Sequence, residues 1–175
     1  MGYCVQPGVF KRKEKKVNRS DSPEATTPSE SRTTMTELVL PNHANVQGNI
    51  LGGRVMHLID LAGAMAAARH CRRQVVTATV DSLVFLHPIQ VGELILLEAN
   101  LTRAFHTSME IEVEVHSEDL QTGERLHTST AFLTFVALDE EGNPCAVPAI
   151  RPESELEKQR YHGGLRRRKE RLKSR

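Results

Sequence analysis

Asp60 is the residue of this sequence whose setting most suggests chemistry. It stands in the stretch VMHLIDLAG, between Ile59 and Leu61. Ionisable side chains rarely occupy apolar surroundings without a partner, and a carboxylate in a partly apolar cleft is suited to act as a general base that activates water. An exposed or salt-bridged aspartate is the competing interpretation.

Asn45 lies upstream of Asp60, in the stretch LPNHANVQG. Its side-chain amide can donate a hydrogen bond to a carbonyl oxygen or hold a water molecule, although an ordinary turn asparagine has the same sequence signature. His57 lies one helical turn before Asp60 and is a candidate hydrogen-bond partner for it. His57 and His43 are equally compatible with surface positions.

Glycines gather just before the helix that is expected to carry Asp60. Gly48, Gly52 and Gly53 permit backbone geometries that are closed to other residues. Gly52 and Gly53 also place free amide groups at a helix N-terminus, where the helix dipole favours negative charge. Such amides are suited to hold the oxyanion that develops during acyl transfer. A phosphate cradle is less favoured, because no Lys-Ser/Thr pair follows the glycines.

Other chemistries lack their motifs. The sequence contains no Ser-His-Asp order, no G-x-S-x-G and no HExxH. Its three cysteines, Cys4, Cys71 and Cys145, are far apart and form no CxxC, which argues against a disulfide framework and a structural zinc site. We therefore expect no metal, and a reducing cytoplasm is the simplest location.

The elements that must position these residues follow from hydrophobic periodicity. From Gly52 the apolar residues recur at steps of three and four, which predicts an amphipathic helix of about five turns. The small residues of AGAMAAA would let a curved sheet approach this helix closely. Alternating patterns then predict four long strands with short antiparallel turns, and a short strand is expected earlier in the chain. The expected ranges are Gln74–Leu86, Glu93–Ala104, Ser108–Glu118, Arg125–Leu138 and Thr36–Leu40.

These elements predict an α+β fold in which one curved antiparallel sheet wraps one long helix. Such a sheet has unpaired edges, and pairing between two copies would satisfy them, so a dimer is expected. Within SMEIEVEVHSE, Glu110, Glu112 and Glu114 share one face of a strand. We interpret this row as a solvated face, because a period of two spreads the carboxylates along the strand.

Charge and composition predict three regions. Residues 1–34 are rich in Ser, Thr, Pro and Glu and are expected to be disordered, 35–155 form the folded domain, and 156–175 form a basic tail. The formal charges of these regions are +3, −9 and +7. The tail is predicted to be helical to about Tyr161, to break at Gly163–Gly164 and to be solvated. Contact with nucleic acid is not favoured because no aromatic residues are interleaved. An anionic membrane surface or a phosphorylated ligand on a neighbouring subunit are the other options. No apolar run is long enough to span a membrane.

The stretch HANVQGNILGGRVMHLIDLAG resembles the signature of the cytosolic acyl-CoA hydrolase branch of hotdog-fold thioesterases. The resemblance continues through VVTATVDSLVFLHPIQVGE and TSMEIEVEV and covers roughly residues 36–161. It implies hydrolysis of acyl-CoA to a carboxylic acid and coenzyme A, in the cytoplasm. Because coenzyme A is part of the substrate and product, no further cofactor is implied.

The resemblance also implies roles for individual residues. Asp60 matches the helix aspartate that acts as base or nucleophile, and Asn45 matches the asparagine that meets it across a dimer interface. Gly52 and Gly53 match the glycines whose amides polarise the thioester carbonyl. The resemblance also implies assembly as a trimer of dimers, that is, a hexamer. Matching positions that line the cleft and the coenzyme A tunnel are Thr77, Asp81, Thr107 and Ser108.

One departure concerns the coenzyme's phosphates. The chain reads Phe105-His106-Thr107-Ser108-Met109 where relatives often have a glycine followed by a basic residue. Arg103 or the basic tail would then have to pair with the phosphates. A non-catalytic acyl-CoA sensor is the main alternative function. A hydratase is less favoured because its His and acid motifs are missing. The strand pattern fixes neither the acyl chain length nor the metabolic pathway.

Overall fold

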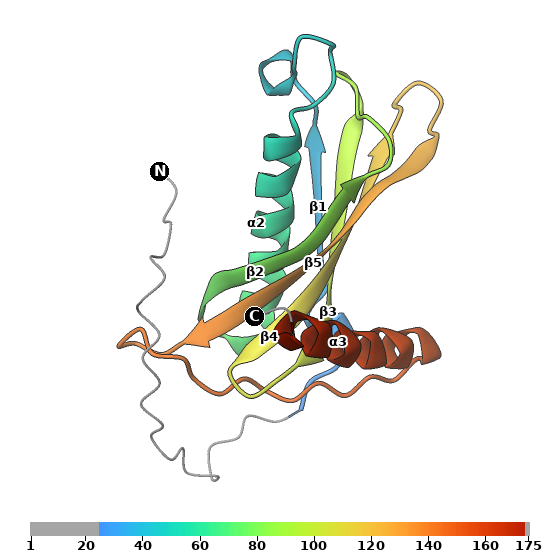
Figure 1. Ribbon diagram of the computed structural model, residues 1–175. Coiled ribbons are helices and arrows are strands. Elements are labelled where there is room, and N and C mark those ends of the chain that lie inside the picture. Colours follow the sequence, from blue (N-terminus) through green and yellow to red (C-terminus); the bar gives the residue numbers. More distant parts are fainter. Residues whose placement is uncertain (1–24, 174–175) are drawn as a thin grey trace.

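A computed structural model describes residues 25–173 of the chain. It contains one sheet and two long helices, with two further helical segments of one turn each (Figure 1). The elements in chain order are α1 (Pro28–Ser31), β1 (Thr33–Leu38), η2 (Pro41–His43), α2 (Gly52–Cys71), β2 (Gln74–Phe85), β3 (Leu94–Ala104), β4 (Ser108–Glu118), β5 (Arg125–Leu138) and α3 (Glu155–Lys173). The predicted central helix and four long strands are confirmed within one residue at each end.

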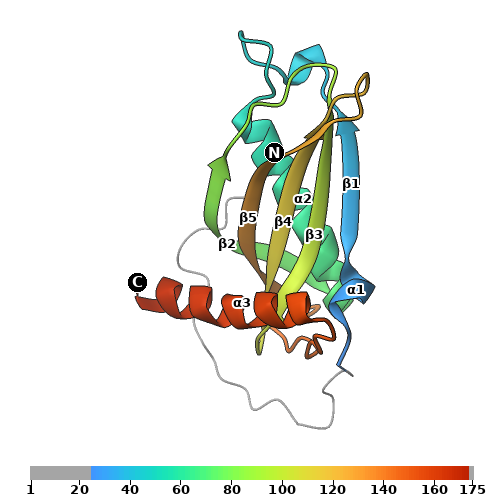
Figure 2. The same cartoon turned by 90° about the vertical axis from the view of Figure 1, so that its right-hand side faces the viewer.

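The five strands form a single antiparallel sheet in the order β1-β3-β4-β5-β2. The sheet curves around α2, which packs along its concave face (Figures 1 and 2). This confirms the α+β class and the hotdog arrangement that the resemblance implied. Strand β2 is an edge strand, and its pairing with β5 shifts register between Thr77 and Thr79 and again between Val80 and Ser82. Such irregularities bend a strand and re-aim its side chains.

Small residues on α2 set the distance between the helix and the sheet. Ala62, Ala66 and Ala67 are fully buried against the strands. At Gly63 an added Cβ would lie 2.9 Å from Cε2 of Phe135 on β5, closer than packed atoms tolerate. The expectation that AGAMAAA permits close approach of the sheet is therefore confirmed, and packing rather than helix propensity explains the glycine.

The glutamate row of β4 corrects one prediction. Met109, Ile111, Val113 and Val115 face α2 and are fully buried, as the alternation predicted. The glutamates face the other way, and two of them are not solvated: Glu110 is 0% exposed and Glu112 is 9% exposed, whereas the side chain of Glu114 is 30% exposed. The row lies beneath α3, which crosses the convex face of the sheet (Figure 2). Arginines of α3 supply the counter-charges that make this burial possible.

The C-terminal region also differs from its prediction. Helix α3 continues through Gly163–Gly164 to Lys173 instead of breaking there. Gly164 is buried, and a Cβ at this position would lie 2.9 Å from Oε1 of Glu110 and 3.0 Å from Cβ of Arg103. Two glycines weaken an isolated helix, but here Gly164 lets α3 approach β3 and β4 closely. Contact with the sheet thus keeps the basic segment helical. No helix within residues 25–173 is long and apolar enough to cross a membrane.

Part of the N-terminal region is ordered as well. Strand β1 begins at Thr33, where Thr33 pairs with Ala99, and α1 precedes it. His70 of α2 anchors this segment, because its Nδ1 lies 3.0 Å from Oγ1 of Thr26 and its Nε2 lies 2.9 Å from the carbonyl oxygen of Pro148. Burial lowers the pKa of His70. The expected disorder is therefore wrong for residues 25–34, and for residues 1–24 it lies outside the described part of the chain.

Candidate active site

Asp60 lies about two turns into α2 and is half-buried. The hydroxyl of Thr77 on β2 donates a hydrogen bond of 2.6 Å to Oδ1 of Asp60. The first register shift of β2 follows directly after Thr77. A donor to one carboxylate oxygen fixes the orientation of the group and leaves the other oxygen available as a proton acceptor.

A cavity of about 330 Å³ opens beside Asp60 between α2 and β2. Its walls are mostly apolar, with Asp60 and His57 as the ionisable groups. This combination of an apolar cavity and few polar groups is typical of a site that binds an amphipathic ligand. Among the described residues, no hydrogen bond joins His57 to Asp60. The lining residues are Gly53, Met56, His57, Ile59, Asp60, Val80, Leu83 and Leu133.

The start of α2 borders this cavity at Gly53. Leu51 is the N-cap residue, and the backbone amides of Gly52 and Gly53 make no hydrogen bond within residues 25–173. At Gly53 an added Cβ would meet nothing within 4 Å. Neither residue has a positive φ, in contrast to Gly48 at 81°. Of these three glycines, only Gly48 therefore needs the conformational freedom that we expected for all three.

Asn45 does not line the cavity beside Asp60 within the single chain. Its Oδ1 accepts hydrogen bonds from the backbone amides of Gln47 at 2.9 Å and Asn49 at 3.2 Å. This arrangement leaves the side-chain NH₂ group of Asn45 without a hydrogen bond to any described residue. The loop is exposed, and the neighbouring Val46 has a relative exposure of 105%. One copy of the chain thus joins Thr77 to Asp60 and places Gly53 in the cavity beside them, without Asn45.

Two of the other predicted ligand-binding residues are engaged by α3. Asp81 pairs with Arg171 and accepts a 3.2 Å hydrogen bond from Thr79 Oγ1. Arg103 donates to the carbonyl oxygen of Tyr161 at 3.0 Å, and its guanidinium stacks 3.9 Å from the Tyr161 ring centroid. Neither residue lines the cavity beside Asp60.

Thr107 ends the turn between β3 and β4, and Ser108 is the first residue of β4. The carbonyl oxygen of Thr107 accepts from the Ala137 amide at 3.1 Å, and that of Ser108 accepts from the Phe105 amide at 2.7 Å. Neither residue lines the cavity beside Asp60. The cavity walls Val80 and Leu83 were not predicted, because the bulge between them breaks the alternation by which a strand face is recognised.

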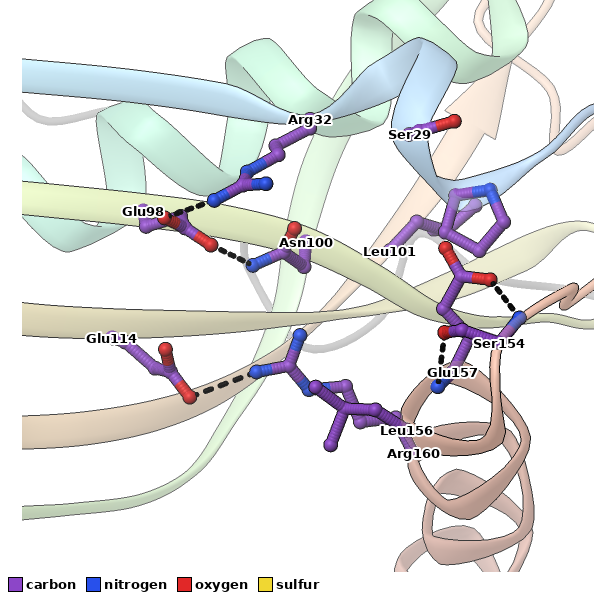
Figure 3. A pocket seen from close by; sticks show the side chains of 11 residues that line it. Ser29, Arg32, Glu98, Asn100, Leu101, Glu114, Ser154, Leu156, Glu157 and Arg160 are labelled. Carbon is purple, nitrogen blue, oxygen red and sulfur yellow. Dashed lines mark hydrogen bonds and ion pairs between the residues drawn. The ribbon is translucent and has the colours of Figure 1, made fainter.

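A second cavity, of about 360 Å³, lies between α1, β3 and the start of α3 (Figure 3). Arg32 pairs with Glu98 at 2.5 Å, and Arg160 pairs with Glu114 at 2.9 Å. Burial opposes ionisation of Glu98, but hydrogen bonds from Arg32 and Asn100 hold its pKa below the usual value. The charged groups of this cavity are paired with one another or, for Glu157, with backbone amides, and the cavity contains none of the predicted catalytic residues.

Relatives of known sequence resemble most of the chain. The family model described as Thioesterase superfamily matches residues 47–124. The uncharacterized acyl-CoA thioester hydrolase YkhA of Bacillus subtilis is 42% identical over 151 residues, which are 86% of this chain and 88% of that protein. The cytosolic acyl coenzyme A thioester hydrolase of Rattus norvegicus is 37% identical over 145 residues, which are 82% of this chain but only 38% of that protein.

Solved structures share the fold. A hexameric acyl-CoA thioesterase is 42% identical with a TM-score of 0.84, and the match covers 87% of this chain and 97% of that one. The acyl-CoA hydrolase of Staphylococcus aureus, solved with butyryl coenzyme A and coenzyme A, is 35% identical with a TM-score of 0.81, over 87% and 92% of the two chains. Three variants of that hydrolase replace an aspartate, an asparagine and a threonine by alanine.

Proposed function

We propose a mechanism from the premise that this chain belongs to the thioesterase superfamily and is an acyl-CoA thioester hydrolase. In this mechanism Asp60 activates water, Asn45 of a second copy completes the site, and the Gly52 and Gly53 amides hold the oxyanion. The observation that carries the proposal is the cavity that the Asp60 carboxylate, oriented by Thr77, shares with Gly53 at the start of α2, where the backbone amide is unbonded.

The chemistry follows from these groups. The thioester carbonyl oxygen accepts hydrogen bonds from the glycine amides, so the carbonyl carbon becomes more electrophilic. Asp60 accepts a proton from water as the water oxygen attacks that carbon. The tetrahedral intermediate then collapses and the C–S bond breaks. The coenzyme A thiolate leaves and takes up the proton from Asp60, and the free carboxylic acid remains.

The spacing of the three polar residues supports these assignments. Asn45, Asp60 and Thr77 are spaced along this chain as are the asparagine, aspartate and threonine that were replaced in the S. aureus hydrolase. Asn45 does not reach Asp60 within one chain, and its NH₂ group is unused by the described residues. A second copy that supplies Asn45 would explain both facts.

The edge of β2 offers the surface for that second copy. Val80, Val84 and Phe85 of β2 and the following Leu86 expose between 47% and 61% of their surface, and Val80 also lines the cavity. Burying this row and pairing the free strand edge would favour a homodimer. We propose a hexamer built from three such dimers, by analogy with the hexameric acyl-CoA thioesterase. Cytoplasmic location is proposed from relatives that are named cytosolic.

The coenzyme A moiety is the less constrained part of the substrate. Thr107 in the β3–β4 turn and Ser108 at the start of β4 remain our candidates for contacts along its tunnel. Arg103 and Asp81 are held by α3, which favours a role in positioning the sheet over direct phosphate contact. The exposed lysines of α3, Lys169 and Lys173, are the alternative partners for the phosphates.

Activity measurements on Asp60→Asn and Asn45→Ala test the proposal. With a thiol reporter and acyl-CoA substrates of several chain lengths, each variant should lose about 10²- to 10⁴-fold in kcat. Near-parental turnover of either variant would show that its residue is wrongly assigned. Binding of acyl-CoA by the parent protein without release of coenzyme A would instead favour a sensor.

Mixed oligomers test whether the site is shared. Subunits carrying Asp60→Asn and Asn45→Ala are each inactive, but a dimer that contains one of each has one site with both native groups. Random mixing should therefore restore activity to about a quarter of the sites. If the mixture stays as inactive as its components, Asn45 and Asp60 do not act together across an interface.

A further inference from the structure

Helix α3 is held on the sheet by three arginines at successive points. Arg160 pairs with Glu112 at 2.7 Å and with Glu114 at 2.9 Å. Arg167 pairs with the buried Glu110 at 2.6 Å. Arg171, near the end of the helix, pairs with Asp81. The first two contacts fasten α3 to β4 in the middle of the sheet, whereas the third reaches the edge strand β2.

The third contact falls on an irregular part of β2. Asp81 lies at the second register shift, between Val80 and Ser82, and has no Cα partner on β5. Its side chain and that of Arg171 are each 16% exposed. Thr79 also donates to Asp81, so the Asp81 carboxylate binds both Arg171 of α3 and a neighbouring residue of β2. At a bulge the hydrogen bonds between strands are interrupted, so they no longer fix the backbone conformation there. Side-chain contacts such as those of Asp81 can then fix it instead.

The same irregular segment carries part of the candidate active site. Thr77, which donates to Asp60, lies just before the first register shift, and Val80 lies between the two shifts. Val80 and Leu83 form a wall of the cavity beside Asp60. Within the described part of one chain, β2 has a neighbouring strand on only one side. A contact from α3 on the outer face can therefore decide how this segment presents Thr77 and Val80 on the inner face.

We propose that Arg171 is a positioning residue of the thioesterase site. Through Asp81 it fixes the bulged segment 77–82 of β2, and this segment orients Thr77 toward Asp60 and sets the wall of the acyl cavity. The inference rests on the proposed function of Asp60. It assigns to the end of the basic C-terminal helix a role in catalysis that needs no contact with the substrate.

The test compares Arg171→Gln, Asp81→Asn and their double variant with Arg171→Lys. The two single variants should each lower kcat about tenfold with KM within about twofold, because misplacement of a catalytic group affects turnover more than binding. The double variant should be no worse than either single variant, because the two residues act as one unit. Arg171→Lys should recover part of kcat. In a Thr77→Val background, Arg171→Gln should change kcat less than twofold.

Arg166→Gln is the matched control, since Arg166 lies on the exposed face of the same helix. It should leave kcat unchanged, and the melting temperature of every variant should be measured beside it. A purely structural role would give parallel losses of kcat and melting temperature that persist in the Thr77→Val background, and this result would overturn the proposal.

Two other outcomes would also overturn the inference. A raised KM with unchanged kcat in Asp81→Asn alone would make Asp81 a ligand of coenzyme A. Parental kcat in Arg171→Gln would remove Arg171 from the site altogether. Failure of the parent chain to release coenzyme A is a separate result, because it contradicts the proposed function and not the coupling between α3 and β2.

Discussion

The proposed chemistry depends on how a single carboxylate is held. Asp60 sits in a mostly apolar cavity and receives a hydrogen bond from Thr77 at 2.6 Å. A hydrogen bond to a charged group contributes about 1.5–3 kcal/mol, so it can fix one orientation of the carboxylate against thermal rotation. The unbonded amides of Gly52 and Gly53 are oriented by the helix and need no side-chain support.

Thr77→Val removes this hydrogen bond while nearly keeping the shape of the side chain. We expect kcat to fall about 10- to 100-fold, since each step of about 1.4 kcal/mol corresponds to a factor of ten. Steady-state kinetics with a thiol reporter provide the measurement. Thr36→Val, the same change at an exposed position of β1, should be neutral. If Thr77→Val retains parental kcat, the hydrogen bond does not serve catalysis.

At the scale of elements, the contact between α3 and the sheet explains why glutamates of β4 can be buried. Glu110 is fully buried, and besides Arg167 it has Thr102, whose hydroxyl donates to Oε1 at 2.6 Å. Burial raises the pKa of Glu112, which Arg160 opposes. Breaking a buried pair by removing one partner typically costs about 3–5 kcal/mol. The basic helix and the glutamate row therefore depend on each other for burial.

Gly164→Ala tests the close approach of α3. On an exposed helix this change would stabilise the protein by up to about 1 kcal/mol, because alanine has the higher helix propensity. Here the new Cβ would lie 2.9 Å from Glu110 Oε1 and 3.0 Å from Arg103 Cβ, so we expect a lower melting temperature.

Gly163→Ala is the control for this substitution. Its Cβ would lie 3.1 Å from Nη1 of Arg167, whose Nε and Nη2 bind Glu110, so a small shift of this one side chain is enough and the melting temperature should fall less than in Gly164→Ala. Thermal unfolding of both variants followed by circular dichroism gives the comparison. Equal or higher stability of Gly164→Ala would mean that α3 does not need this contact.

At the scale of the whole molecule, the single chain leaves its proposed site incomplete. The β2 edge and its apolar side chains are exposed, and Asn45 lies in an exposed loop away from Asp60. Dimerisation would thus be required for activity, because the surface proposed to bind a second copy adjoins the cavity that needs Asn45 of that copy.

Val84→Lys places a charge in the middle of this exposed row. We expect the oligomer to dissociate and hydrolysis to fall together with the molar mass, because a charge buried without a partner opposes association. Light scattering coupled to size-exclusion chromatography, with activity assayed in each fraction, measures both. Leu120→Lys, in the β4–β5 turn, is the control and should leave both unchanged. A monomer with full activity would contradict a shared site.

The sequence alone determined the elements and the local candidates. Hydrophobic periods of 3.6 and 2 depend only on which residues neighbour one another along the chain, so they predicted α2, β2, β3, β4 and β5 closely. The spacing of Asn45, Asp60 and the glycine pair could also be recognised from the sequence, because all four residues lie within one loop and the helix that follows it.

Only the tertiary structure decided which charged side chains are buried and with which partners they pair. A row of glutamates on a strand has the same pattern whether it faces water or a helix, and nothing local to β4 indicates that α3 covers it. The helix itself has two adjacent glycines, which predict a break unless a distant surface compensates. The contacts of Arg171 with Asp81 and of Thr77 with Asp60 join residues that are far apart along the chain. Long-range packing and charge burial create these contacts, so no local pattern could have predicted them.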